Sequence, residues 1–192
     1  NAVPGPSPVP RSNAAFYRRD SNSLQYWSPT FYGFSLRASY TTNEFSRAAR
    51  PAAGQNPAIP EIQPDIFSGL LSYDNGPLKL RYAAELHRDY FGLSLIGGAP
   101  GGSATNSSSL DVGHHGVAAY TFQLSEAIST RLAATVDYLS YENDDTVSGN
   151  VDQYQRAAFY GLIDQSYNAH HLWFAYGQAD SGSCSLVGSA AC

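Results

Sequence analysis

The chain has 192 residues, with 11 Lys and Arg against 16 Asp and Glu, a formal net charge of −5 and only 14% charged residues. This acidic balance leaves no basic stripe to neutralise phosphates, which argues against a nucleic-acid partner. No apolar run reaches the roughly 20 residues of a transmembrane helix. Seventeen Gly, 14 Tyr and few charges disfavour a helical protein, so an all-β chain rich in Tyr remains.

Along the chain, residues 1–16 are rich in Pro and lack periodicity, which predicts an irregular arm or loop. A short extended segment follows at residues 21–27. Apolar and polar residues alternate from 31 to 42, and this period of two predicts a strand with one apolar face. The apolar side of that strand holds Phe34, Leu36, Ala38 and Tyr40.

The same pattern continues over residues 17–180 and predicts about eight strands in total. The further strands are expected at residues 65–73, 78–90, 113–122, 130–141, 154–163 and 170–178. Asp74-Asn75-Gly76-Pro77 predicts a tight turn, because Asn-Gly supplies the positive φ that a short hairpin requires. Residues 181–192 are predicted as a loop or tail that carries both cysteines.

The connections between these strands alternate in length. Long connections are predicted at 43–63, 91–110 and 143–152, and short ones fall between them. Short connections therefore lie at one end of the sheet and long ones at the other. This sorting is typical of an antiparallel up-and-down transmembrane β-barrel, whereas a soluble β-sandwich has Greek-key crossings and no such sorting.

The composition of the apolar face favours an orientation with apolar side chains outside and polar side chains inside. Small residues on this face would pack a soluble core poorly but face lipid at little cost: Gly69, Ala84, Gly116 and Ala118. Aromatic residues lie near strand ends or on the same face, as a girdle at the membrane interface requires: Tyr73, Tyr82, Tyr120, Phe122 and Tyr138.

A sequence signature supports this orientation. Within residues 18–34, the run Asn22-Ser23-Leu24-Gln25-Tyr26-Trp27-Ser28-Pro29-Thr30-Phe31-Tyr32-Gly33-Phe34, with an Arg before it, resembles the Arg…Asn-Ser-x-x-Tyr-x-Ser-Pro-x-Phe-x-Gly-Phe signature of Gram-negative general porins. Segments 73–78, 117–122, 141–144 and 174–180 also resemble that family, in the same order. The resemblance covers roughly residues 17–192.

The resemblance implies an outer-membrane channel that passes ions and small hydrophilic solutes by passive diffusion. It implies a homotrimer in outer-membrane lipid, with no cofactor and no enzymatic activity. The resemblance implies a closed barrel of about sixteen strands. Eight strands in 192 residues correspond to about half of one, so the chain is expected to be the middle to later part of a porin.

The resemblance also implies a cluster of inward Arg side chains that faces an acidic inward-folded loop. Arg19 matches the signature Arg by its spacing to Asn22-Ser23, and the neighbouring Arg18 is the alternative. The acidic loop is expected to precede residue 1. Alternation adds further pore-lining candidates: Arg37, Lys79, Arg81, Glu85, His87, Asp89 and Arg131. For each of these the alternative is a solvated polar face with no role in selectivity.

Metal and catalytic sites find little support. His114-His115 and His170-His171 are adjacent strand residues, which point to opposite faces and so do not chelate one ion. Cys184 and Cys192 lack further ligands nearby, and a small-loop disulfide is favoured over two free thiols. No Ser stands in a nucleophile elbow, and no catalytic constellation is found.

Two other functions compete with a diffusion channel. One is a plugged outer-membrane barrel that acts as a structural or adhesive surface protein. Bulky inward residues would favour it, and the candidates are Tyr160, Leu162 and Trp173. The other is a soluble β-rich binding domain, in which the apolar face would be a buried core.

Overall fold

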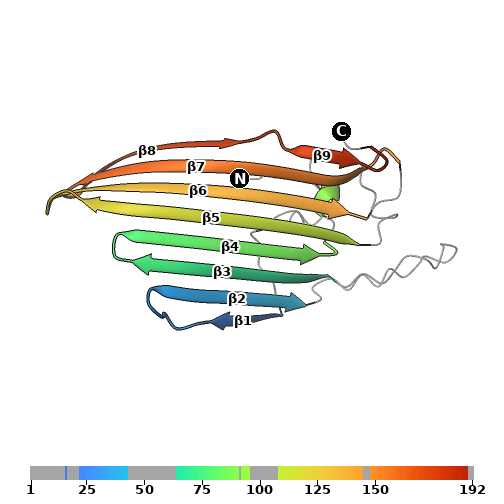
Figure 1. Cartoon of the computed structure of the whole chain (residues 1–192), viewed down its shortest axis with the longest axis horizontal. Coiled ribbons are helices and arrows are strands. Elements are labelled where there is room, and N and C mark those ends of the chain that lie inside the picture. Colours follow the sequence, from blue (N-terminus) through green and yellow to red (C-terminus); the bar gives the residue numbers. More distant parts are fainter. Residues whose placement is uncertain are drawn as a thin grey trace, which may run out of the picture.

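The computed structural model describes residues 16, 22–42, 64–90, 92–95, 108–144 and 148–189. Within these residues the chain forms nine strands and one short 3₁₀ helix, and all strands belong to one antiparallel sheet (Figure 1). The elements are β1 (Ser23–Trp27), β2 (Phe34–Thr42), β3 (Asp65–Asn75), β4 (Leu78–Arg88), η1 (Gly92–Leu95), β5 (Ser109–Gln123), β6 (Ile128–Asn143), β7 (Val151–Tyr167), β8 (His170–Ala179) and β9 (Ser183–Leu186).

The sheet is a simple meander in which each strand from β1 to β8 pairs with the next along the chain. In Figure 1 the short connections between β1 and β2, β3 and β4, β5 and β6, and β7 and β8 all lie at the same end of the sheet, as predicted from their lengths. The β3–β4 hairpin has a two-residue loop, Gly76–Pro77, in which Gly76 adopts a φ of 55°. A residue without a Cβ adopts that conformation at no steric cost.

The last strand, β9, corrects the prediction that residues 181–192 form only a loop or tail. Both β8 and β9 pair with β7, which contributes Ala158–Tyr167 to β8 and Val151–Gln155 to β9. Between them, the Asp180 carboxylate accepts hydrogen bonds from the backbone N–H groups of Ala157 and Gly182, at 3.2 and 2.9 Å. β8 and β9 therefore act as one interrupted edge strand beside β7. The nine strands thus occupy eight successive positions across the sheet.

Two strands, β5 and β7, extend furthest beyond their predicted bounds. β5 begins at Ser109, four residues before the prediction, because Asp111 and its neighbours pair with β4 and β6. β7 runs to Tyr167, into the short connection predicted between residues 163 and 170. Polar side chains there are paired: the Ser129 and Ser166 hydroxyl oxygens lie 2.6 Å apart, and Thr130 donates to Gln165 at 2.7 Å.

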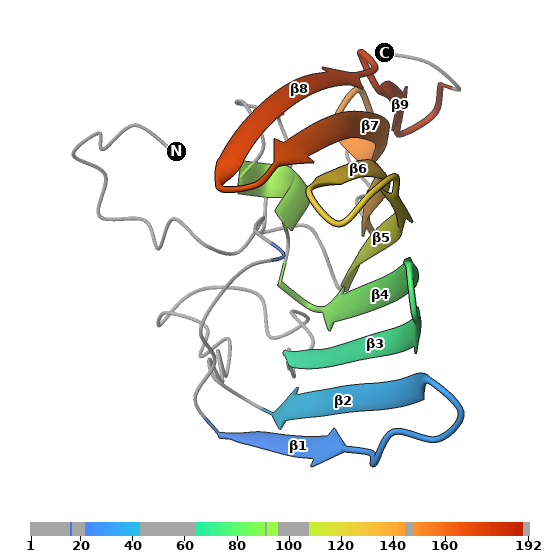
Figure 2. The same cartoon turned by 90° about the vertical axis from the view of Figure 1, so that its left-hand side faces the viewer.

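The sheet curves strongly, so that successive strands follow an arc with η1 on its inner side (Figure 2). The burial pattern is inverted relative to a soluble domain. Only Ile66, Tyr90, Leu93, Ala119 and Tyr141 are buried hydrophobics in the described part of the chain, whereas 26 large hydrophobic side chains are exposed. No helix in this part has the length and hydropathy that a membrane span requires.

Candidate functional site

The inner, concave face of the sheet carries the polar side chains and holds a groove of about 690 Å³. The register places its lining residues in two neighbouring rows across β1 to β6. One row comprises Gln25, Ser39, Ser68, Glu85, Gly113 and Leu139, and the next comprises Trp27, Arg37, Leu70, Ala83, His115 and Asp137. Alternation along each strand therefore delivers polar groups from six strands to one surface.

The charged groups in this groove are individually paired. The Glu85 carboxylate accepts a hydrogen bond from the Ser68 hydroxyl at 2.7 Å and lies 2.6 Å from His87 Nε2. Asp137 lies 2.6 Å from His115 Nδ1 in the same way. The Arg37 guanidinium lies 5.0 Å from the centre of the Trp27 ring, within cation–π distance. Acidic groups thus lie toward β4–β6, and Arg37 lies toward β1.

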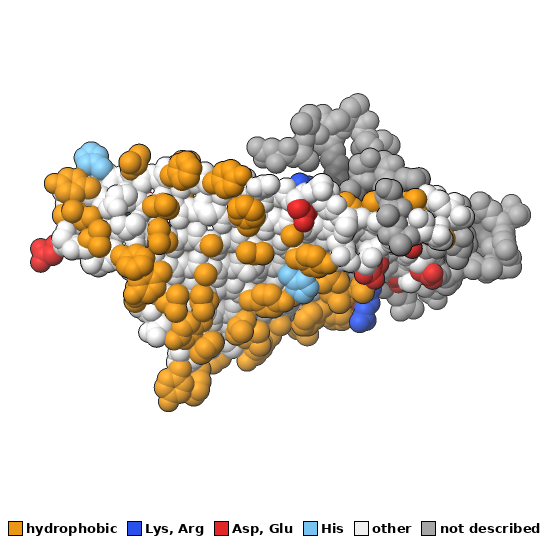
Figure 3. Space-filling model, turned by 45° about the horizontal axis from the view of Figure 1, so that its top comes forward, with side chains coloured by type: hydrophobic (Ala, Val, Ile, Leu, Met, Phe, Trp, Pro, Cys, Tyr) orange, Lys and Arg blue, Asp and Glu red, His pale blue; other side chains and the backbone are white. Residues whose placement is uncertain are grey.

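The outer, convex face is apolar over most of its height. Figure 3 shows hydrophobic side chains spread over the strands, with charged side chains gathered largely toward the end with long connections. The exposed residues on this face include Phe34, Leu36, Phe67, Leu71, Leu80, Tyr82, Tyr120, Phe122, Leu132, Val136, Tyr138, Phe159, Ile163, Leu172, Phe174 and Tyr176. An apolar patch of this size on a monomer marks an interaction surface, here one that covers most of the height of the outer wall.

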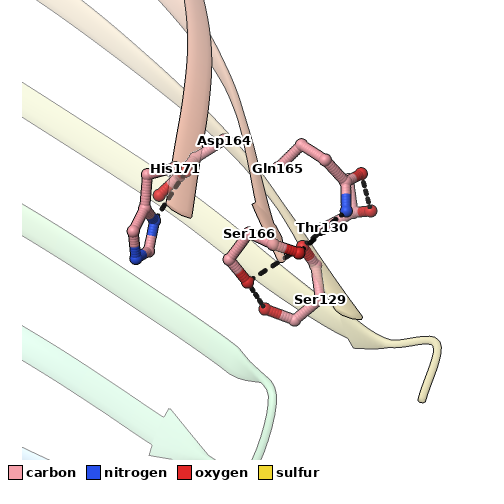
Figure 4. Close-up of polar contacts among 6 residues, drawn as sticks. All are labelled: Ser129, Thr130, Asp164, Gln165, Ser166 and His171. Atoms are coloured by element: carbon pink, nitrogen blue, oxygen red, sulfur yellow. Dashed lines mark hydrogen bonds and ion pairs between the residues drawn. The ribbon is translucent and has the colours of Figure 1, made fainter. Parts of the chain in front are cut away.

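Polar pairs limit the apolar band at both ends. At the long-connection end, Arg88 lies 3.7 Å from Asp65, and Gln153 donates to Glu142 at 2.7 Å. At the short-turn end, Figure 4 shows Thr130 bonded to Gln165 on β6 and β7. Glu142 follows Thr130 by twelve positions on β6. At about 3.3 Å per residue and a tilt of about 45°, this spans about 28 Å, which matches a bilayer's apolar core.

An apolar outer band of membrane height, a polar concave face and a meander with sorted connections are the features of a transmembrane β-barrel wall. The family model for the Gram-negative porin matches residues 6–182, which is most of the chain. The chain belongs to the Gram-negative porin family. Comparison with curated proteins and with solved structures found no match.

Membership of the porin family fixes the location and the general activity. Porins are outer-membrane diffusion channels of Gram-negative bacteria, and they are not enzymes. The soluble binding domain is therefore excluded. Its premise also fails on the structure, because the apolar face is the exposed outer wall and not a buried core.

Most of the predicted pore-lining residues of this porin chain lie on the concave side of the register. Arg37, Glu85 and His87 belong to the groove end, and Lys79, Arg81 and Arg131 lie nearer the short turns. His87 is fully buried, because the Phe16 ring stacks on it at a centroid distance of 4.8 Å. Of these residues, His87 therefore contributes no exposed surface to the concave face.

The cationic residues near the short turns differ in their partners. One guanidinium nitrogen of Arg81, Nη2, donates to both carboxylate oxygens of Asp74, at 2.9 and 2.8 Å, on the concave face. Arg131 faces Asp164 across the β6–β7 register. Lys79 is the register partner of Asp74 on β3.

Asp89 departs from the concave row. It follows the last residue of β4 and has a φ of 57°, so the chain bends there. Its backbone N–H donates to the Ser109 carbonyl at 2.9 Å, and its carboxylate accepts from the Ser109 N–H at 3.2 Å. Asp89 thus closes the ladder between β4 and β5.

Three of the predicted site residues lie outside the described part of the chain: Arg18, Arg19 and Cys192. Cys184 lies on β9 and is disulfide-bonded. Its pairing with Cys192 stays a prediction. Because β9 pairs with β7, the disulfide lies beside the edge of the sheet at the end with long connections.

Sequence reasoning missed several acidic residues of the concave face, namely Asp111, Asp137 and Asp164. Alternation on residues 130–141 already placed Asp137 on the polar side, and that signal was available. Asp111 was missed because it lies between the connection predicted to end at residue 110 and the strand predicted to begin at residue 113. Asp137 and Asp164 each pair with a histidine, His115 and His171 respectively, and the His171–Asp164 distance is 3.3 Å. The His87–Glu85 pair is a third contact of the same kind.

The adjacent histidines lie on opposite faces, as neighbouring strand residues must. His115 contacts Asp137 on the concave side, whereas His114 lies 2.8 Å from the Tyr82 hydroxyl on the convex side. Among the described residues no group of three or more His, Cys, Asp or Glu side chains could hold a metal ion.

Proposed function

We propose that this chain forms part of the wall of a closed, water-filled barrel through which ions and small hydrophilic solutes diffuse passively. The observation that carries the proposal is the division of the sheet into an exposed apolar convex face and a charged concave face. Water-exposed charges on one side and lipid-compatible side chains on the other are the arrangement of a porin wall. Transport then needs no chemical step.

The charges on the concave face support a role in ion passage. Glu85, Asp137 and Arg37 border the groove, and Arg81 with Asp74 lies nearer the short turns. In confined water, charges on the wall change the free energy of a passing ion, and so they tune selectivity. We propose that these residues, with Lys79 and Arg131, line the pore, and that Arg18 and Arg19 do so as well.

The experiment that tests this function is reconstitution in planar bilayers of the natural polypeptide that contains this chain. Stepwise increases in conductance are expected, with a linear dependence of step size on salt concentration at high salt. A preparation that folds into lipid and yields no conductance steps would contradict the proposal.

A plugged structural barrel is the alternative, and one observation favours it. Tyr160, Leu162 and Trp173 lie on the concave side of β7 and β8, opposite Gly177, Ala175 and Asp164 respectively. Tyr160 and Trp173 are 44% and 68% exposed there. Bulky side chains at these positions would narrow the lumen, at mid-strand beside Tyr160 and nearer the short turns beside Trp173. If these residues restrict an open pore, replacement of Trp173 by Ala raises the conductance. If the lumen is plugged elsewhere, the variant conducts no ions, like the unmodified barrel.

We also propose that the complete protein is a homotrimer in outer-membrane lipid. Membership of the porin family supports this proposal. The exposed convex face also has room for both lipid and subunit contacts. Chemical cross-linking in native outer membranes tests this proposal. A ladder that ends at three subunits is expected, and a monomer without cross-links would contradict it.

A further inference from the structure

The groove on the concave face carries opposite charges at its two ends. At one end, Arg37 on β2 is the register partner of Trp27 on β1, and its guanidinium lies 5.0 Å from the centre of the indole ring. At the other end, His115 on β5 is the register partner of Asp137 on β6 and pairs with its carboxylate. All four residues belong to one row of the register, so both ends lie at the same height on the wall.

Both charged ends are open to a solute. Arg37 is exposed and makes no ion pair with any residue in the described part of the chain, and the Trp27 ring beside it is 66% exposed. Asp137 contacts His115 through Oδ1, and within the same part of the chain Oδ2 makes no hydrogen bond. The Asp137 side chain is 42% exposed, so this second oxygen can accept from a bound cation.

An apolar floor, formed by Leu70 on β3 and Ala83 on β4, separates the two ends. The register runs from Arg37 through these two residues to His115. Neighbouring strands lie about 4.8 Å apart, so the backbones of Arg37 and His115 are about 14 Å apart, and inward side chains shorten the gap. Neither floor side chain donates or accepts a hydrogen bond, so the floor favours a hydrocarbon over a polar group.

Glu85 lies beside this floor, but its carboxylate is already occupied. Its Oε2 accepts a hydrogen bond from the Ser68 hydroxyl at 2.7 Å, and its Oε1 lies 2.6 Å from His87 Nε2. Both oxygens are thus engaged with the wall itself. The open carboxylate of the groove is therefore Asp137, at the end opposite Arg37.

We propose that the groove is a binding site for zwitterionic solutes whose carboxylate and ammonium groups are separated by a short apolar spacer. Arg37 holds the carboxylate, Asp137 holds the ammonium group, and the spacer lies on the apolar floor. The inference rests on the proposed channel function, since a solute reaches this face through the water-filled barrel. The groove volume of about 690 Å³ suits a small-molecule site. Both charged ends are partly exposed, so binding is weak enough for the solute to leave.

The test is a fluorescence titration of the complete natural polypeptide in lipid vesicles with ε-aminocaproate. The Trp27 indole lines the groove and reports its occupancy, so Trp27→Phe should abolish the change in fluorescence. Caproate and hexylammonium each carry one of the two charges on the same hydrocarbon chain, and glycine carries both charges without the spacer. ε-Aminocaproate is expected to bind about threefold to fivefold more tightly than each of these three probes, the effect of one partly exposed ion pair.

Two variants assign the two ends independently. Arg37→Gln should weaken ε-aminocaproate and caproate about threefold to fivefold and leave hexylammonium unchanged. Asp137→Asn should weaken ε-aminocaproate and hexylammonium by the same factor and leave caproate unchanged. Arg88→Gln and Glu142→Gln are the matched controls, because each removes a charge of the same sign outside the groove, at the end with long connections. Urea unfolding of each variant confirms that the barrel is folded.

The inference is supported if each groove variant weakens only the probes that carry the matching charge. It is overturned if all four probes bind alike, or if the two control variants weaken binding as much as the groove variants, because overall surface charge would then explain the result. If the protein conducts in planar bilayers and binds none of the probes, the inference fails and the channel function stands. Binding with the expected pattern in a protein that does not conduct would support the site and refute the channel.

Discussion

The hydroxyl of Tyr82 lies 2.8 Å from Nδ1 of His114, on the convex face of neighbouring strands β4 and β5. His114 interrupts an outward side of β5 that is otherwise built from apolar residues and glycine between Val112 and Phe122. The Tyr138 ring lies on the other side of the imidazole, with ring centres 6.2 Å apart. A polar ring in the apolar band is thus satisfied by a neighbouring phenol and covered by a second aromatic ring.

Tyr82→Phe is expected to destabilise the folded barrel by about 1 kcal/mol, because it leaves a His114 ring nitrogen without its partner in an apolar environment. The free energy of unfolding, measured by urea titration in lipid vesicles, checks this. His114→Leu is expected to be neutral or stabilising, since it places an apolar side chain outward. In the His114→Leu background Tyr82→Phe should have almost no effect, and equal effects in both backgrounds would refute the coupling.

Gly113→Ala is expected to destabilise the fold by about 1–3 kcal/mol, because the new Cβ would meet the Phe16 ring. At its ideal position that Cβ lies 2.9 Å from Phe16 Cδ1. The ring cannot simply shift, since it stacks on His87 and lies near Tyr141. Urea unfolding of Gly113→Ala, Phe16→Ala and the double variant tests this. The double variant should be more stable than the sum of the two single losses predicts, and strict additivity would contradict the contact.

The Arg81–Asp74 pair is expected to affect ion selectivity more than stability. Both side chains are partly exposed, so the pair contributes only about 0–1 kcal/mol to folding. Arg81→Gln should shift the reversal potential in a salt gradient toward cation preference, and Asp74→Asn should shift it toward anion preference. Both shifts should shrink at high salt as screening increases. Absence of a shift in both variants would show that neither residue faces the ion path.

The disulfide of Cys184 is expected to link it to Cys192. Closing a loop of this length stabilises a folded chain by about 2–3 kcal/mol in the chain-entropy model, so reduction should lower the thermal midpoint of the β9 region. Peptide mapping before and after reduction and alkylation identifies the partner. A peptide that joins Cys184 to a cysteine elsewhere would refute the predicted pairing.

Much of the wall was predictable because a strand in a two-faced sheet must alternate. On β4 alternation assigns Tyr82 and Ala84 to the apolar face, and both pair in register with outward residues of β3 and β5. Gly76 was correctly placed in a tight turn. These features depend only on neighbours in sequence, which is why pattern reading found them.

The missed elements depend on partners far along the chain. The end of β7 looks like a turn because Gln165 and Ser166 are polar, yet both bond to β6 at the membrane boundary. β9 is a Ser-rich segment that forms a strand only because β7 offers it an edge. No periodicity marks either segment, since hydrogen bonds across the sheet outweigh their weak local preference.

The sequence by itself determined the all-β class, the sorting of short and long connections, the orientation of the apolar face and the family. It did so because a barrel wall repeats one physical constraint, lipid on one side and water on the other, at every second residue. Only the tertiary structure decided what lies on the concave face at the end with long connections. There Asp111 accepts a hydrogen bond from the Gly92 N–H, and the Phe16 ring packs against Gly113. No local sequence pattern encodes contacts between residues so far apart in the chain. Close approach between distant segments depends on the shape of both surfaces, and that shape exists only once the sheet has curved.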